Sequence, residues 1–205
     1  RVSAAFALVR LSNDYTIEFW MRRTGRGPGS SPFYEIWLDG RFNAPPSLRF
    51  QYIKASGQGY MQNDLNVWLN GTELRANTPL MGWTHVAGVR DVTAGTYTLF
   101  VGGMAVDVEP DQGGMINLDR LSLGFEVVAP GEYEVAGAID EVRVSSNARY
   151  TAQFTPAVVL VPDIDTVLLW HLDEGGGAMV GDSSGNGRGA TVMGGTWAAD
   201  DRTCR

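Results

Sequence analysis

The feature that most constrains this chain is a succession of short apolar runs, each ended by a turn-forming sequence. Residues 15–21 alternate strictly, with Ile17, Phe19 and Met21 on one face. The turns are pairs that favour tight reversals, among them Asp39-Gly40, Asn70-Gly71 and Gly102-Gly103. No stretch keeps a 3.6-residue apolar period over a helical length. The sequence therefore predicts an all-β protein.

About eleven to thirteen strands are expected, enough for a two-sheet antiparallel β-sandwich. Residues 155–165, with two prolines and two aspartates, are expected to cross from one part of a sheet to another. The strand candidates are residues 15–21, 33–38, 48–53, 66–69, 83–90, 96–101, 104–108, 121–125, 138–144, 167–172 and 190–193.

Charge and the length of the apolar runs exclude two classes of partner. Its net charge is −7, and Lys54 is its one lysine, so no basic patch for nucleic acid is expected. No apolar run approaches the roughly 18 residues that a membrane span needs, so no membrane insertion is expected.

Several motifs, taken together, resemble a known family. Residues 15–21, 82–89, 98–103 and 137–144 carry the sequences YTIEFWM, GWTHVAGV, TLFVGG and GAIDEVRV, and a run from Asp173 to Gly189 contains DEGGG and DSSGNG. In this combination the chain resembles a laminin-G-like, concanavalin A-like jelly-roll domain over roughly residues 14–197. The resemblance implies an all-β jelly roll.

The order of these motifs is unusual, because in the resembled family the DEG and DSSGNG segment leads the domain, whereas here it closes the chain. Either this segment begins a second domain, or it folds back and supplies the first strands of this one. The second interpretation is preferred. It predicts a single domain over residues 1–205, with residues 166–205 completing the sandwich.

A calcium site is expected around Asp140. Strand alternation places Asp140 on the face of Val142 and Val144, where a carboxylate is desolvated and needs compensation. A hard cation with oxygen ligands would compensate it. The resemblance implies a structural Ca²⁺ between the last strand and the glycine-rich turns, with Asp173 and Asp182 as further ligands. In the alternative interpretation Asp140 accepts backbone N–H bonds and Asp182 caps a turn.

Aromatic side chains are the candidates for ligand binding. Trp37, Tyr52, Tyr60 and Trp68 cluster in the segment after the first core strand. Flat rings can stack on the apolar faces of sugars, while neighbouring polar groups bond the hydroxyls. The alternative is that these rings fill the core.

Catalytic motifs are weak. The two histidines, His85 and His171, lie within strands, and no G-x-S-x-G elbow surrounds Ser183 or Ser184. The paired acids that jelly-roll glycosidases place as E-x-D-x-x-E on one strand are also missing from the sequence. No catalytic residue is assigned, and a glycoside hydrolase or lyase is the weakest alternative.

The resulting expectation is a non-catalytic, extracellular or cell-surface recognition module of a bacterial surface or secreted protein. Carbohydrate binding or adhesion is its expected role, with a glycan or a cell-surface protein as partner. The alternative is a structural module that binds other domains or subunits of a larger surface assembly. Since one fold hosts many functions, the resemblance alone does not choose between them.

Overall fold

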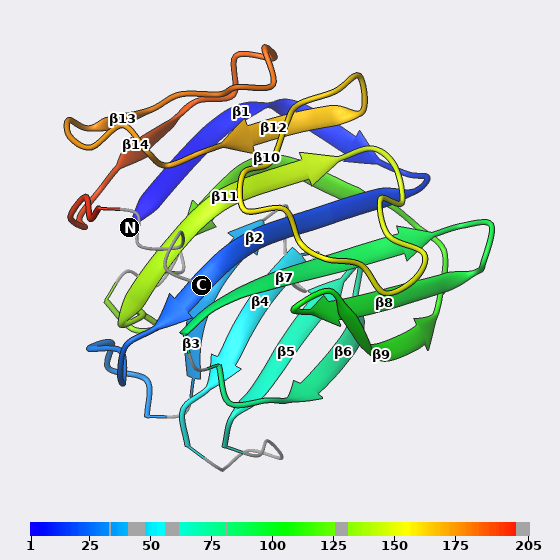
Figure 1. Cartoon of the computed structure of the whole chain (residues 1–205), viewed down its shortest axis with the longest axis horizontal. Coiled ribbons are helices and arrows are strands. Elements are labelled where there is room, and N and C mark those ends of the chain that lie inside the picture. Colours follow the sequence, from blue (N-terminus) through cyan, green and yellow to red (C-terminus); the bar gives the residue numbers. More distant parts are fainter. Residues whose placement is uncertain (33, 41–47, 56–61, 81, 126–130, 200–205) are drawn as a thin grey trace.

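The chain forms two antiparallel sheets packed face to face (Figure 1). A computed structural model describes residues 1–32, 34–40, 48–55, 62–80, 82–125 and 131–199. These residues contain fourteen strands and no helix, and none of them belongs to a helix that could span a membrane. The predicted all-β sandwich is confirmed.

Sheet A has eight strands and sheet B has six. In spatial order, sheet A contains β13 (Met179–Val180), β14 (Ala190–Val192), β1 (Val2–Leu11), β10 (Ile116–Leu123), β3 (Tyr34–Gly40), β4 (Leu48–Ile53), β5 (Asp64–Leu69) and β6 (Thr72–Asn77). Sheet B contains β12 (Thr166–Trp170), β11 (Gly137–Ser145), β2 (Tyr15–Arg23), β7 (Gly82–Asp91), β8 (Thr96–Val101) and β9 (Met104–Pro110).

Alternation along the strands builds the core between the sheets. Ile17, Phe19 and Met21 of β2 are fully buried and belong to the main core cluster. Phe19 meets Phe50 of β4 edge to face, with ring centroids 5.1 Å apart, the geometry that aromatic quadrupoles favour. The alternating pattern of residues 15–21 thus fixes which face of β2 meets sheet A.

Strand β1 is not among the strands predicted from the sequence. It pairs with β10 on one side and with β14 on the other. Leu8, in its middle, is 44% exposed, and the pairing with β10 shifts register between Ala5 and Val9. The irregular alternation that results explains why periodicity gave no clear strand signal here.

The C-terminal segment adds strands to both sheets. Strand β12 pairs with β11, and Trp170 of β12 stands opposite Val142. Strand β14 pairs with β1 through Val2 and Ser3. Leu168 and Trp170 are buried in the core cluster, so this segment contributes apolar surface to the space between the sheets.

Part of the outer face of sheet B is covered by residues 146–165, which we call the strap. In Figure 1 the strap is the yellow loop between β11 and β12 that crosses in front of the sheet. It packs Tyr150 and Phe154 on Phe100, and the Trp20 indole N–H donates to Ala157 O over 3.0 Å. The crossing predicted for residues 155–165 therefore runs over a face of the sandwich.

A charged network is buried beneath the strap. Glu18 is fully buried and accepts hydrogen bonds from Arg143 Nε (2.8 Å), His85 Nε2 (2.9 Å) and the Tyr150 hydroxyl (2.7 Å). Burial by itself would raise the pKa of Glu18, but the His85 hydrogen bond, the charge of Arg143 and the Tyr150 hydroxyl outweigh it and hold the pKa below its ordinary value. The carboxylate therefore stays ionised and ties β2, β7, β11 and the strap together.

We predict that Glu18→Gln lowers the free energy of unfolding at pH 7 by about 3–5 kcal/mol, because Arg143 is left buried without its counter-ion. The lowered pKa stabilises the fold above the unfolded-state pKa of about 4.3, and this contribution is lost as the pH falls through the folded-state value. The gap between wild type and variant should therefore narrow below about pH 4 in urea unfolding. Glu73→Gln is the control, because Glu73 is partly exposed in its ion pair with Arg75 and glutamine keeps an oxygen that can accept from Asn66. This change should lower the free energy of unfolding by less than about 0.5 kcal/mol.

Trp170→Ala should lower the free energy of unfolding by about 3–5 kcal/mol, since it removes a fully buried ring from the core. Met179→Ala, in the same segment but 66% exposed, should change it by less than about 0.5 kcal/mol. Equal, small effects in denaturant melts would show that the C-terminal segment adds nothing to the folded core.

Candidate functional site

A cavity of about 820 Å³ opens at the edge of the sandwich beside β11. Strand β2 pairs with β11 from Gly137 onward, whereas β12 reaches only residues 142–145. Beyond the end of β12 the chain leaves sheet B, and residues 172–175 and 192–199 form the opposite wall with parts of β1 and β10. The cavity therefore occupies the space that a longer β12 would fill.

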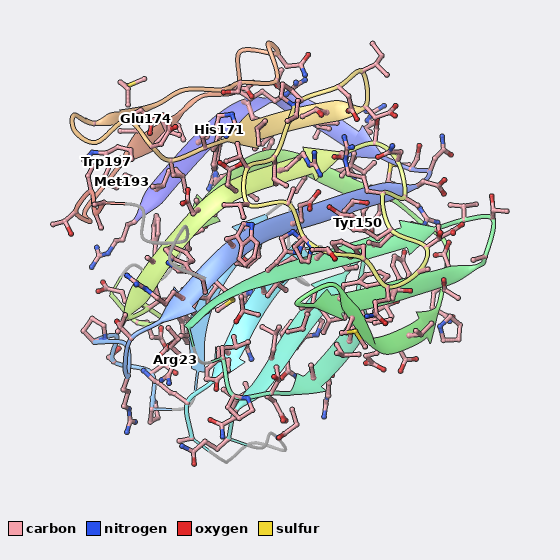
Figure 2. All side chains as sticks on the ribbon, viewed as in Figure 1. Arg23, Tyr150, His171, Glu174, Met193 and Trp197 are labelled. Atoms are coloured by element: carbon pink, nitrogen blue, oxygen red, sulfur yellow. The ribbon has the colours of Figure 1, made fainter. Side chains whose placement is uncertain are left out.

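Two tryptophans line this cavity and are partly exposed. Trp83, at the start of β7, carries the Arg22 guanidinium over its ring at 5.1 Å from the centroid. Trp197 follows the last strand, and its indole N–H donates to Gly177 O over 2.9 Å. Because this bond fixes the polar edge of the Trp197 ring, the indole is held at the cavity. Figure 2 shows Trp197 on the same side of the molecule as His171 and Glu174.

The charged side chains of the lining include three carboxylates and two guanidinium groups. Asp140, on β11, is 7% exposed, and its Oδ1 accepts the backbone N–H of Glu141 over 3.0 Å. Asp173 is exposed at the rim, while Glu134 forms an ion pair with Arg1. The lining residues that carry charge are Arg1, Arg22, Glu134, Asp140 and Asp173.

A β-bulge sets the direction of Asp140. Ile139 pairs with Met21 of the core, Asp140 pairs with Trp20 of the outer face, and the register shifts before Arg143. Glu141 lies in the bulge with φ at +52°, a left-handed conformation that side chains rarely adopt. The expectation that Asp140 shares the face of the core valines is therefore wrong, because the bulge inserts a residue and resets the alternation.

Hydrogen bonds of the Glu141 side chain hold the bulge. The Glu141 carboxylate accepts hydrogen bonds from His171 Nδ1 at 2.9 Å and from the Leu160 backbone N–H at 2.8 Å. Immediately after His171, Leu172 also has a positive φ, +62°. The chain turns away from sheet B at this point, and this turn opens the cavity.

The structure separates the three predicted calcium ligands. Asp140 and Asp173 line the cavity, but Asp182 caps a turn and accepts backbone N–H bonds from Leu169, Ser184 and Arg188. Burial would raise the pKa of Asp182, but the backbone bonds from Arg188 and Leu169 outweigh it and lower the pKa. Its oxygens face N–H donors, which does not fit a cation ligand. Among the described residues, no three His, Cys, Asp or Glu side chains form a group that could hold a metal ion.

The predicted aromatic cluster is dispersed. Trp37 is fully buried in the core, and Tyr52 is 2% exposed, with Arg23 over its ring at 4.8 Å. Neither ring therefore offers a face to a ligand. Trp68 is partly exposed on β5, away from the cavity, and Tyr60 lies outside the described residues.

Sequence reasoning selected Asp140 and Asp173, but not the tryptophans that share the cavity with them. Trp83 lies in the GWTHVAGV motif, which indicated only the family resemblance. Trp197 lies beyond the last strand, where alternation gives no information about facing. The GAIDEVRV motif, which contains Asp140, and the DEGGG turn, which contains Asp173, were the two sequence signals that pointed toward this edge of the sandwich.

Calcium binding stays a prediction, and it now depends on Asp140 and Asp173. If a cation binds the folded state there, a hundredfold excess over Kd adds about 2.7 kcal/mol of stability. A chelator should then lower the Tm of wild type and of Asp182→Asn, but not that of Asp140→Asn. A wild-type Tm that ignores the chelator would contradict the calcium site.

Several solved structures have a similar fold at low sequence identity. A protein of Bacteroides ovatus, described as a candidate carbohydrate binding protein, matches 95% of this chain and 56% of its own, with a TM-score of 0.71 at 20% identity. The chain thus spans little more than half of that protein. A pentraxin of Limulus polyphemus covers 73% of this chain and 71% of its own, with a TM-score of 0.52 at 12% identity.

A third similar structure is the CBM40 module of a Ruminococcus gnavus sialidase bound to α2,3-sialyllactose. It covers 68% of this chain and 78% of its own, with a TM-score of 0.50 at 15% identity. No curated protein sequence matches the chain. The model of the concanavalin A-like lectin/glucanases superfamily matches residues 1–153, and the resemblance seen in the sequence is thereby confirmed: the chain belongs to this superfamily.

Proposed function

We propose that this chain is a non-catalytic carbohydrate-binding module and that the cavity beside β11 is its binding site. The observation that carries the proposal is the pair of partly exposed tryptophans, Trp83 and Trp197, in one cavity with Asp140 and Asp173. Indole faces stack on the apolar faces of sugar rings, and carboxylates accept hydrogen bonds from sugar hydroxyls. The volume of about 820 Å³ lies within the usual range of ligand sites, about 300–1,000 Å³.

The similar structures support the same class of ligand. The CBM40 module is bound to sialyllactose, and the Bacteroides ovatus protein is described as a candidate carbohydrate binding protein. At 12–20% identity these similarities concern the fold, and one fold supports many functions. The proposal for this chain therefore rests on its own cavity, and a bacterial extracellular or cell-surface setting belongs to the same proposal.

The non-catalytic part of the proposal is supported by the strap. Glu18 and His85 form a close carboxylate–imidazole pair, but both are fully buried under the strap. A polysaccharide cannot reach them on the outer face of sheet B. Incubation with polysaccharides, followed by a reducing-end assay, should give no cleavage products.

A structural module that binds protein partners is the second candidate, and one observation favours it. The strap exposes apolar side chains, with Val159 56%, Val161 71% and Ile164 98% exposed. Grouped apolar side chains at a surface often mark a protein contact. A glycan array without hits would favour this function over the first.

The test of carbohydrate binding is a glycan array followed by titration calorimetry of the best hit. Trp197→Ala should weaken binding at least about tenfold, a loss of about 1.4 kcal/mol, because a stacking face is removed. Trp83→Ala should act likewise. Trp68→Ala is the matched control, since Trp68 is partly exposed but lies outside the cavity.

Thermal melts of each variant separate lost binding from lost folding, which matters most for Trp83 because it starts a central strand. If Trp68→Ala abolishes binding while Trp197→Ala does not, the glycan binds the outer face of sheet A and the cavity assignment is wrong.

A further inference from the structure

We infer that the cavity beside β11 takes a sugar that carries a methyl group, as in an N-acetyl or a 6-deoxy sugar, and that this methyl group packs on aliphatic side chains between the two sheets. This inference rests on the proposed function, because it names the class of sugar that the same cavity takes. It is carried by the aliphatic part of the lining, which we call the floor. The floor consists of Val2, Leu123, Val135, Ile139, Leu172 and Val192.

Strand register places one side of the floor on the inner face of sheet A. Val192 of β14 stands opposite Val2 of β1, and Val2 stands opposite Leu123 of β10. Residues directly opposite each other in a sheet share a face, and Leu123 belongs to the main core cluster. The three side chains therefore form a row that faces sheet B, and each lies at the end of its strand.

Ile139 of β11 supplies the sheet B side of the floor. It stands opposite Met21, a fully buried core residue of β2, so its side chain points to the inner face. Val135, just before β11, and Leu172, just after β12, complete the floor. All three floor residues named here are partly buried and pack against the core cluster. The cavity thus continues the apolar space between the sheets.

The floor and the indoles of the lining fit different parts of a sugar. Trp83 and Trp197 line the same cavity, and an indole can stack on the flat face of a sugar ring. The floor instead offers branched aliphatic side chains. A hydroxyl that meets them gives up water without gaining a hydrogen-bond partner. A methyl group loses no hydrogen bond there, and its apolar surface is removed from water.

Two common kinds of sugar carry a methyl group in addition to a ring face. One has an acetamido group on the ring, and the other is a 6-deoxy hexose, in which C6 is a methyl group. In both, the remaining hydroxyls stay available for the polar groups of the lining. The shared chemistry is the methyl group, and the two arms of the experiment separate its sources.

The experiment is a glycan array followed by titration calorimetry on matched sugars. We expect the strongest hits to contain an N-acetyl or a 6-deoxy sugar. An N-acetyl hit is compared with its N-formyl analogue, which lacks the methyl group, and a 6-deoxy hit with its parent hexose, which carries a hydroxyl at C6. The methyl-bearing member should bind at least about tenfold tighter, because a hydrophobic pocket discriminates a single such group by about this factor.

The matched variants are Val192→Thr and Val167→Thr, because threonine has nearly the shape of valine and adds a hydroxyl. Both valines are partly buried and pack against the core cluster, but of the two only Val192 lines the cavity. Val192→Thr should lower the affinity ratio within a pair at least about threefold, since a hydroxyl now meets the methyl group. Val167→Thr should leave the ratio unchanged. Val2→Thr is the second floor variant, and it decides the outcome if thermal melts show that Val192→Thr does not fold.

Strong hits that lack a methyl-bearing sugar, or equal affinities within a matched pair, would overturn the inference and leave carbohydrate binding in place. A ratio that neither floor variant changes, or that Val167→Thr lowers as much as they do, would also overturn it, since the methyl group would then lie away from the floor. An array without any bound glycan would instead overturn the proposed function, and this inference with it.

Discussion

The bulge in β11 is the local constraint on which the candidate site depends. Glu141 takes a left-handed conformation there, and the contacts of its carboxylate with His171 and the Leu160 N–H hold it in place. Such a conformation persists only when its surroundings stabilise it. Here the bulge turns Asp140 to the outer face and coincides with the point where β12 leaves its neighbour. Without it, β12 could continue along β11 and close the cavity.

Two regions of sheet B differ in their chemistry. On the strap side, Glu18 joins His85 and Arg143 in a buried hydrogen-bonded network, which stabilises the fold and leaves no open surface for a ligand. At the β11 edge, carboxylates and indoles line an open cavity. A search for function by residue type alone would have favoured the buried network, because it holds the histidine and the acid. Because Glu18 and His85 are buried and the cavity is open, the cavity is the better candidate site.

The sequence by itself determined the all-β sandwich, because alternation and turn pairs act locally: β4 (Leu48–Ile53) and β8 (Thr96–Val101) have the predicted bounds. It also indicated that Asp182, in the DSSGNG motif, could cap a turn, and Asp182 does accept the backbone N–H bonds of that turn. Tertiary structure decided the rest. The bulge moved Asp140 off the core face, Trp37 went inside, and Trp197 reached the cavity from beyond the last strand. Alternation cannot reveal an inserted residue or the path of a chain after its last strand, because both are settled by contacts between segments distant in sequence.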